Sequence, residues 1–360
     1  MSKTKKIKIF ALPSHTTAER ISGVDFARII QPMEFLSKHK DFEVHIFDPK
    51  EKADWRDICK KYDIIYFNYL ANDWGFAAMG CEARKNGVKL VMDLDDDLWD
   101  ILPDNPAYQV YKPSEKAIKN FTAICDEVDY ITTTSMYLKH VINNNTRKHP
   151  TQVKVFPNYI DLDLYSHRSK FKDTNEIVLL HFGSTTHFLD LAEDEFMKGI
   201  DRIMSDFPNV KFKTVGAMLP DYKNRWGMRY ENDFGHPDIY KWIKEKFPKF
   251  MDEADIIVVP LKRSIYTKAK SSIKFLEASS AKKPGVWQNI RQYDEVIDGN
   301  NGFLAETADE WYQAIKMLID DKTLRKKMGL RAFDTVQKHW QMGDKVEDYA
   351  DWFKKIFDTP

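Results

Sequence analysis

The sequence predicts an α/β protein with two domains in series, each built on a doubly wound parallel sheet. Short apolar runs alternate with longer stretches whose apolar residues recur at helical spacing, and this rhythm restarts after about residue 170. Alternating strands and helices form βαβ units and parallel sheets. The length of 360 residues suits about two domains of ~150 residues each. Because such sheets bind ligands at the carboxyl ends of their strands, we expect a cleft between the domains.

In the first half, short apolar and β-branched runs predict the strands, and helix-spaced apolar residues predict a helix after the first strand. Phe26, Ile29, Met33 and Leu36 share one face of that helix, and Ile118–Cys125 indicates another. The predicted strands are Lys6–Leu12, Phe42–Phe47, Ile64–Tyr69, Val88–Leu94, Tyr130–Thr133 and Val153–Phe156.

The polar stretch Lys170–Glu176 is interpreted as the linker between the halves. We therefore expect domains at 1–170 and 171–340, followed by a helical segment at 341–360. Pro248 is expected to end the second helix of the second domain, because proline interrupts helices. The predicted strands there are Ile177–Phe182, Val210–Val215, Ile256–Leu261 and Gly285–Gln288. The predicted helices lie around 196–204, 239–250, 272–281 and 308–357.

Composition excludes several classes of protein. Hydrophobic residues make up 43% of the chain and charged residues 31%, which is typical of a globular protein and unlike a disordered one. Lys plus Arg and Asp plus Glu both number 55, so the formal charge is zero. This balance removes any whole-chain argument for binding to nucleic acid or to an anionic membrane, although a local basic patch would still suffice.

Cysteine usage and the short apolar runs predict a soluble, cytoplasmic protein. Cys59, Cys81 and Cys125 lie far apart, so their spacing indicates neither a disulfide framework nor a metal knuckle. Reduced thiols are usual in the cytosol. The apolar stretch after the basic N-terminus, Ile7–Leu12, is too short for a signal peptide. The longest apolar runs fall far below the ~18 residues that cross a bilayer.

The most informative segment follows the strand that ends near Pro260. On the predicted helix, Lys270, Lys274 and Glu277 stand at i, i+4 and i+7, which places them on one face. Two ammonium groups near a helix N-terminus, where Ser271 offers a hydroxyl, would suit a diphosphate. A carboxylate on the same face would accept hydrogen bonds from ribose hydroxyls. The alternative is a solvated charged face with ordinary helical spacing.

This segment resembles the donor-binding signature of retaining GT-B glycosyltransferases of family 4, the glycosyl transferases group 1. The matching residues are Pro260-Leu261, Lys270-Ser271-Ser272-Ile273-Lys274-Phe275-Leu276-Glu277-Ala278 and Pro284. Asp255–Pro260, Tyr293 with Glu295–Leu304, Trp311 and Val155–Asp161 also resemble family segments, in the same order along the chain. The resemblance covers the second half firmly and the first half loosely.

The resemblance implies a GT-B fold, in which two Rossmann-like domains face a cleft and a C-terminal helix crosses back to the first domain. It implies that Lys270, Lys274 and Arg263 neutralise the donor's diphosphate, without a metal ion or a cofactor, and that Glu277 binds its ribose. It also places Gly183 and Ser184 at a phosphate-binding turn.

One position departs from the family pattern. Ala269 stands where many members carry a first glutamate that contacts the transferred sugar, and Lys270 or Ser271 would fill that space. This departure keeps open the alternative of an inactive protein that only binds the nucleotide-sugar.

The acidic run Asp93-Leu94-Asp95-Asp96-Asp97 follows a predicted strand and has three interpretations. It could hold Mg²⁺ or Mn²⁺, act as a phosphoacceptor site, or form the acceptor-side wall of the GT-B cleft. The resemblance favours the last, with Asp95, Asp96 and Asp97 as the candidate catalytic residues. Gly23 belongs to a loop that the family places near the acceptor.

We therefore predict a glycosyltransferase that moves a sugar from a nucleotide-sugar to an acceptor hydroxyl, with retention and without a metal. A surface glycan or a lipid-linked sugar is the expected acceptor. The segment Tyr222–Tyr230 interleaves aromatic and basic residues, which leaves a modified base in DNA as an alternative acceptor, although zero net charge counts against it. The sugar, the nucleotide and the oligomeric state are left open.

Overall fold

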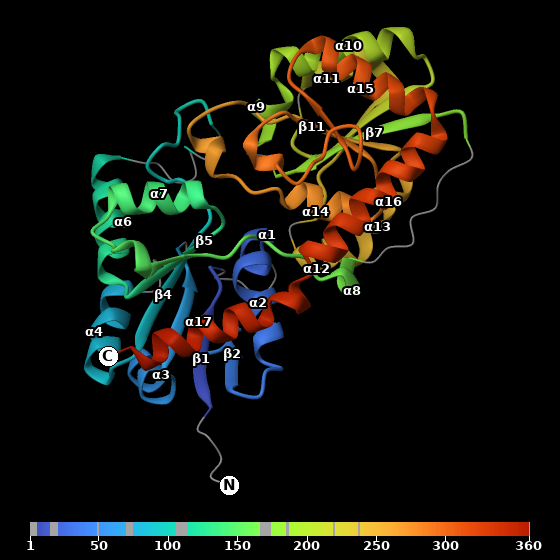
Figure 1. The fold of residues 1–360 in the computed structure, drawn as a ribbon. Helices are drawn as coiled ribbons and strands as arrows, with labels where there is room; N and C mark the ends of the chain where they lie inside the picture. The colour runs from blue at the N-terminus through green and yellow to red at the C-terminus, as the bar shows by residue number, and fades with distance from the viewer. Residues whose placement is uncertain are drawn as a thin grey trace.

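The computed structural model describes residues 6–14, 21–48, 50–69, 75–105, 108, 114–165, 174–184, 187–218, 220–236 and 238–359. In these ranges the chain forms two α/β domains that lie side by side (Figure 1). Lys170–Asp173, most of the predicted linker, lies outside the described residues.

The first domain is built on a six-stranded parallel sheet with the order β2-β1-β3-β4-β5-β6. Each predicted strand of this half is present, with its ends within one residue of the prediction. The strands are β1 (Ile7–Leu12), β2 (Phe42–Ile46), β3 (Ile64–Asn68), β4 (Lys89–Leu94), β5 (Tyr130–Thr133) and β6 (Val153–Val155).

Helices cover both faces of the first sheet. One face packs against residues such as Ile58, Met79, Phe121 and Leu138 from four helices, of which only α6 was predicted. The four helices are α3 (Trp55–Lys61), α4 (Phe76–Asn86), α6 (Glu115–Glu127) and α7 (Met136–Asn145). The other face packs against two helices from opposite parts of the chain. They are α2 (Gln31–Leu36), which continues α1 (Gly23–Asp25) and a π-helical stretch (Phe26–Ile30), and α17 (Val346–Asp358).

The second domain repeats this plan with a six-stranded parallel sheet of order β12-β11-β10-β7-β8-β9. The four predicted strands are present, and two short edge strands, β9 and β12, were not predicted. The strands are β7 (Ile177–Gly183), β8 (Val210–Gly216), β9 (Tyr230–Asp233), β10 (Ile256–Val259), β11 (Gly285–Gln288) and β12 (Phe303–Ala305).

Two groups of helices cover this sheet. One face packs against α10 (Asp194–Asp206), α11 (Pro220–Trp226) and α15 (Ala308–Asp320). The other face packs against α13 (Phe247–Glu253), α14 (Ile273–Ser280) and α16 (Lys322–His339).

Pro248 does not end a helix, contrary to the prediction. It occupies the first turn of α13, directly after α12 (Ile239–Lys241) and a π-helical stretch (Trp242–Lys246). The helical run therefore continues through Pro248, and the π-helical turn directly before it shifts the hydrogen-bond pattern at the position where proline supplies no amide.

The last helix returns to the first domain, as the GT-B prediction requires (Figure 1). After α16, the amide of Met342 donates to the carbonyl of Ile160 at 2.9 Å, which ties the crossing to the end of the first domain. The ring of Tyr349 on α17 then stacks on Phe156 with the centroids 3.8 Å apart. Phe353 packs edge-on against Tyr66 on β3. This helix therefore completes the core of the first domain.

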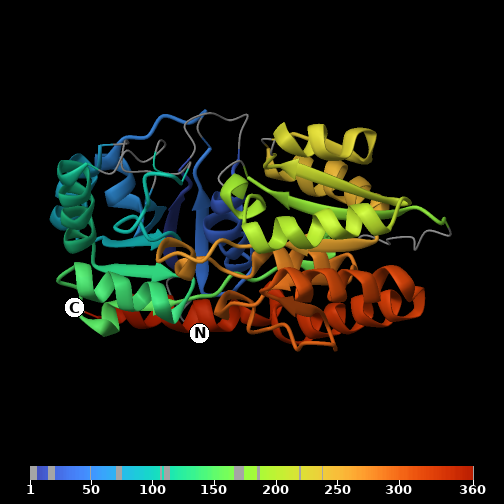
Figure 2. The same ribbon diagram turned by 90° about the horizontal axis from the view of Figure 1, so that it is seen from above.

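The domains also touch on both sides of the space between them. The loop after β10 reaches across to the first domain, where a short 3-10 helix (Tyr266–Ala269) lies beside α7 (Figure 2). Ala269 is fully buried in the first domain's core. On the other side, the amide of Ile239 donates to the carbonyl of Ile21 at 2.9 Å. The carboxyl ends of the two sheets thus face each other across a partly closed cleft.

Candidate functional site

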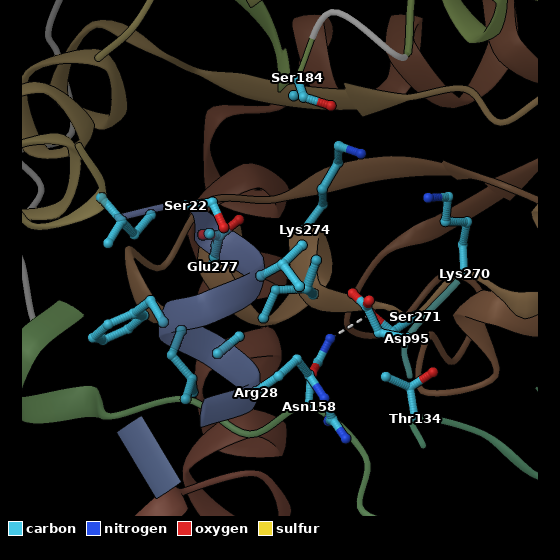
Figure 3. Close-up of a pocket in the computed structure, with 18 of the residues that line it drawn as sticks. Ser22, Arg28, Asp95, Thr134, Asn158, Ser184, Lys270, Ser271, Lys274 and Glu277 are labelled. Carbon is cyan, nitrogen blue, oxygen red and sulfur yellow. Dashed lines mark hydrogen bonds between the residues drawn. The ribbon is translucent and has the colours of Figure 1, made fainter. Parts of the chain in front are cut away.

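A cavity of about 390 Å³ lies between the carboxyl ends of the two sheets. On one side it is lined by Asp95, which follows β4, and by Asn158, which follows β6. On the other side it is lined by the end of β7 and by α14, whose Lys274 points toward Ser184 (Figure 3). This is the position where doubly wound sheets bind their ligands.

Lys274 and Glu277 stand one turn apart on the face of α14 that lines the cavity. Burial, together with the charge of Lys270, lowers the pKa of Lys274 to about 8. Burial raises the pKa of Glu277 to about 7, against the opposing effects of Lys274 and of a 3.2 Å hydrogen bond donated by Tyr165. The two groups thus give one helix face a cation and a carboxylate that titrate near neutral pH.

The turn after β7 holds Lys274 in place through His187. The Nζ of Lys274 lies 3.0 Å from Nε2 of His187, and Nδ1 of His187 lies 2.6 Å from a carboxylate oxygen of Asp190. Burial and the lysine charge lower the pKa of His187 to about 4, so the imidazole is neutral at pH 7. Its Nδ1–H then donates to Asp190, which leaves Nε2 to accept from the lysine.

Gly183, the last residue of β7, lies close beneath this pair. A Cβ atom at this position would stand 3.0 Å from Cε of Lys274 and 3.0 Å from Cδ2 of His187. Any larger residue would therefore push the lysine or the histidine aside. The glycine keeps the backbone of the turn exposed to the cavity beside the ammonium group, which is the geometry of an anion site.

Lys270 and Asp96 form an ion pair across the cavity, with 2.6 Å between Nζ and the carboxylate. Tyr266 donates its hydroxyl to Asp96 at 3.1 Å and accepts a hydrogen bond from Lys270 at 3.0 Å. Burial lowers the pKa of Lys270, but Asp96 and Tyr266 outweigh it, so this pKa stands well above its usual value. The charges predicted on opposite walls of the cleft are therefore joined.

The acidic run after β4 points its side chains in different directions. Asp95 and Asp96 line the cavity, whereas Asp97 does not. Asp97 turns inward and accepts a hydrogen bond from the amide of Trp99 at 3.2 Å, so its predicted catalytic role has no support from its position. Burial, and the neighbouring charges of Asp96 and Asp93, raise the pKa of Asp95 well above its usual value. This environment favours the protonated form of the carboxyl group.

Arg28 connects this acidic run to the floor of the cavity. Its guanidinium makes a two-pronged contact with buried Asp93, at 3.0 Å from Nε and 2.9 Å from Nη2. Nη1 donates to Oδ1 of Asn158 at 2.9 Å, and Asn158 in turn donates to the hydroxyl of Ser271 at 2.7 Å (Figure 3). A hydrogen-bonded chain thus runs from the first sheet to the start of α14.

Most of the predicted site residues line one cavity. Arg263 is an exception, since it lies outside the cavity, where it pairs with Glu306 at 2.8 Å and donates to the carbonyl of Asn289. Arg28, Tyr165 and Tyr266 also line the cavity and were not predicted from the sequence. The predicted residues that do line it are Gly23, Asp95, Asp96, Gly183, Ser184, Lys270, Ser271, Lys274 and Glu277.

The aromatic and basic segment Tyr222–Tyr230 is not a binding loop. Tyr222 and Trp226 lie on α11 and are buried against Phe212 of β8. Arg225 pairs with Asp201 at 2.7 Å instead of facing outward alone. The aromatic residues were placed by core packing, which the interleaved pattern does not distinguish from a stacking surface.

Within the described ranges, no group of three or more His, Cys, Asp or Glu side chains is arranged to hold a metal ion. Among the helices of those ranges, none has both the length and the apolar character required to cross a membrane.

Solved structures of other proteins share the fold of the whole chain, and a family model matches the sequence of the second domain. Residues 176–321 match the family model described as Glycosyl transferases group 1. Sucrose-phosphate synthase from Thermosynechococcus elongatus superposes with a TM-score of 0.69 at 15% identity, covering 99% of this chain and 100% of that one. HepE from Anabaena in complex with UDP-glucose gives a TM-score of 0.67 at 14% identity, with coverages of 97% and 100%.

A glycosyltransferase from Rickettsia africae has a TM-score of 0.61 at 14% identity and covers 99% of this chain and 100% of its own. No curated protein matches the chain by sequence. These likenesses confirm the predicted GT-B arrangement of two domains and a returning helix, and the family model confirms the resemblance read from the second half of the sequence.

Proposed function

We propose that this chain, which has the GT-B fold and whose second domain matches the group 1 family model, is a glycosyltransferase that transfers a sugar from a nucleotide-sugar to an acceptor hydroxyl. The pairing of Lys274 and Glu277 on one face of α14, beside the open turn at Gly183, carries this proposal. HepE is solved with UDP-glucose, so this is the first donor to test.

The second domain would hold the donor. The diphosphate would lie between the ammonium group of Lys274 and the backbone of Gly183 and Ser184, which favours anions. Glu277 would accept hydrogen bonds from the ribose hydroxyls. His187, neutral and fixed by Asp190, accepts from Lys274 and adds no positive charge that would have to be desolvated.

Departure of the nucleotide builds negative charge on its diphosphate. We propose that Lys274 and Lys270 stabilise this charge, so that transfer needs neither a metal ion nor a cofactor. Retention of the anomeric configuration, which the group 1 resemblance implies, is part of the proposal. Proton NMR of the glycoside product reads the configuration directly from the coupling of its anomeric proton.

The first domain would receive the acceptor next to Asp95 and Asp96. Because burial and its acidic neighbours raise the pKa of Asp95, its protonated carboxyl would donate a hydrogen bond to a sugar oxygen, while Asp96 would accept one. We propose a carbohydrate hydroxyl as the acceptor, on a glycan or on a lipid-linked sugar. A cytoplasmic location remains a prediction, supported by three free cysteines.

The test uses a panel of nucleotide-sugars and two readouts. A donor that binds only the native state raises the melting temperature, since it stabilises by about 2.7 kcal/mol at a concentration of ~100 Kd. Release of the nucleotide reports transfer or hydrolysis, which separates an enzyme from an inactive binding protein. The proposal fails if no nucleotide-sugar stabilises the protein, and the enzymatic part fails if stabilisation occurs without release.

Lys274→Ala is the matching variant, because it should abolish both readouts while the fold remains intact. Lys327→Ala removes an exposed lysine from α16, away from the cavity, and serves as its control. Equal loss in both variants would mean that the assay measures total charge and not the cavity.

A further inference from the structure

A second hollow of about 470 Å³ shares one wall residue, Lys270, with the first cavity. Three segments of the chain form it. They are the first turn of α7 around Met136, the loop 263–268 that follows β10, and the turn 290–292 that follows β11. A molecule in this hollow would lie one side chain away from the candidate site.

The lining of this hollow is basic. Arg263, Lys268, Lys270 and Arg291 line it, and no carboxylate does so among the described residues. The rest of its lining is neutral and includes the hydroxyls of Ser264 and Thr267. Such a surface favours an anion over a neutral sugar.

Two of these cations are largely available to a ligand. Lys270 is held by Asp96, and Arg263 by Glu306 at 2.8 Å. Arg291 is exposed, and its pairing with Asp294 spans 3.9 Å, the outer limit of an ion pair. Lys268 is exposed and its ammonium has no ion-pair partner among the described residues. Surface pairs as long as that of Arg291 contribute little, so a phosphate would readily displace it.

We propose that this hollow binds a phosphate group carried by the acceptor, so that the acceptor is a phosphorylated carbohydrate. The inference rests on the proposed transferase function, which assigns the donor's own diphosphate to Lys274 and Gly183 in the first cavity. Lys268 and Arg291 hold the phosphate, and Lys270 marks the boundary between the two substrates. The size of the hollow and the zero net charge of the chain favour one phosphate over a long polyanion.

The test measures binding of glucose 6-phosphate by calorimetry to the protein saturated with UDP. We expect binding that weakens with salt, and an affinity lower by about tenfold or more in the double variant Lys268→Gln/Arg291→Gln. The matched control is Lys327→Gln/Arg331→Gln, which removes one exposed lysine and one exposed arginine from α16 and should change nothing. Glucose serves as the uncharged probe and should not bind in this range.

A second arm uses phosphatidylcholine vesicles that contain a polyprenyl phosphate. Binding to either probe that is lost in the double variant supports the proposal, and the preferred probe shows whether the phosphate belongs to a free sugar or to a lipid carrier. Equal affinity of the wild type and the double variant for both probes overturns it. The proposal would also be overturned if duplex DNA bound the wild type more tightly than either probe does and did not bind the double variant. The basic lining would then serve a nucleic acid.

The UDP titration separates this proposal from the proposed function. If UDP binds every variant equally, the donor site is intact, and the phosphate result reports on the hollow alone. If UDP binds none of them, UDP is not the nucleotide of the donor, and the proposed function itself fails only if no other nucleoside diphosphate of the panel binds either. In both cases the glucose 6-phosphate comparison, repeated without UDP, still decides the role of Lys268 and Arg291.

Discussion

The ammonium of Lys270, on the donor side of the cleft, lies 2.6 Å from the carboxylate of Asp96 on the acceptor side. This pair places one cation between two anions, because the donor's diphosphate would enter the cavity that both residues line. The contact joins the two sides of the cleft, and the diphosphate would compete with Asp96 for the lysine.

Neutralising Asp96 should release Lys270 to the diphosphate. We expect Asp96→Asn to bind UDP severalfold more tightly than the wild type at the same salt concentration, as measured by calorimetry. The reason is that binding would no longer require the ion pair between Lys270 and Asp96 to be broken. The gain should vanish in the double variant Asp96→Asn/Lys270→Gln. A gain that persists without Lys270 would contradict the competition.

The lowered pKa of Lys274 predicts that donor binding weakens at alkaline pH. The diphosphate favours the charged amine, whose pKa is lowered to about 8, so the affinity for UDP should fall as the pH rises above 8. Lys274→Arg keeps its charge at every accessible pH and should lose this alkaline decline. Because both proteins bind the same ligand, the difference between their pH profiles cancels the titration of UDP itself. Parallel profiles would exclude Lys274 as the titrating group.

The raised pKa of Glu277 predicts that donor binding weakens at acid pH. Ribose hydroxyls favour the carboxylate, whose pKa is raised to about 7, so the affinity for the donor should rise as the pH increases through 7. At pH 8, UDP should bind about tenfold more tightly than 2′-deoxy-UDP, as expected for one hydrogen bond to a charged group. Glu277→Gln should abolish most of this discrimination. If the variant discriminates as well as the wild type, the ribose lies elsewhere.

The buried pair of Arg28 and Asp93 predicts a stability effect that is separate from binding. Both side chains are at most 1% exposed, so Arg28→Met would leave a buried, uncompensated carboxylate. We expect the free energy of unfolding to fall by about 3–5 kcal/mol, measured by urea denaturation. Arg28→Met/Asp93→Asn should recover part of this loss. A double variant that is less stable than the single one would show that the charge of Asp93 is satisfied by Tyr66 and Thr132 alone.

The strands that were predictable have either a continuous apolar sequence, such as β10, which is buried on both faces, or apolar residues that alternate with polar ones, as in the first half of β8. β9 has the polar sequence Tyr-Glu-Asn-Asp at the edge of its sheet, so it shows no strand pattern. β12, at the other edge, is the short run Phe-Leu-Ala, which has neither alternating polar residues nor the β-branched residues that mark a strand. The helix α3 was missed for a similar reason, because it buries only Ile58 and Cys59 and its apolar face is too short to show a period.

The same distinction between local and long-range geometry decides which site residues could be predicted from the sequence. The spacing of Lys270, Lys274 and Glu277 was readable because a helix converts spacing into a shared face. Arg28 and Tyr165 were not readable, since their partners lie 65 and 112 residues away in sequence and meet them only through the tertiary fold. The contact between Lys270 and Asp96 likewise depends on how the two domains close.

The returning helix α17 has a consequence for biosynthesis. The aromatic surface formed by Phe156 and Tyr66 stays uncovered until Tyr349 and Phe353 arrive, and the entire second domain is translated in between. The first domain therefore cannot complete its core until the second domain has been translated and α17 has left the ribosome. A chain cut before α17 should expose that side to other molecules and aggregate, even though each of its sheets is complete.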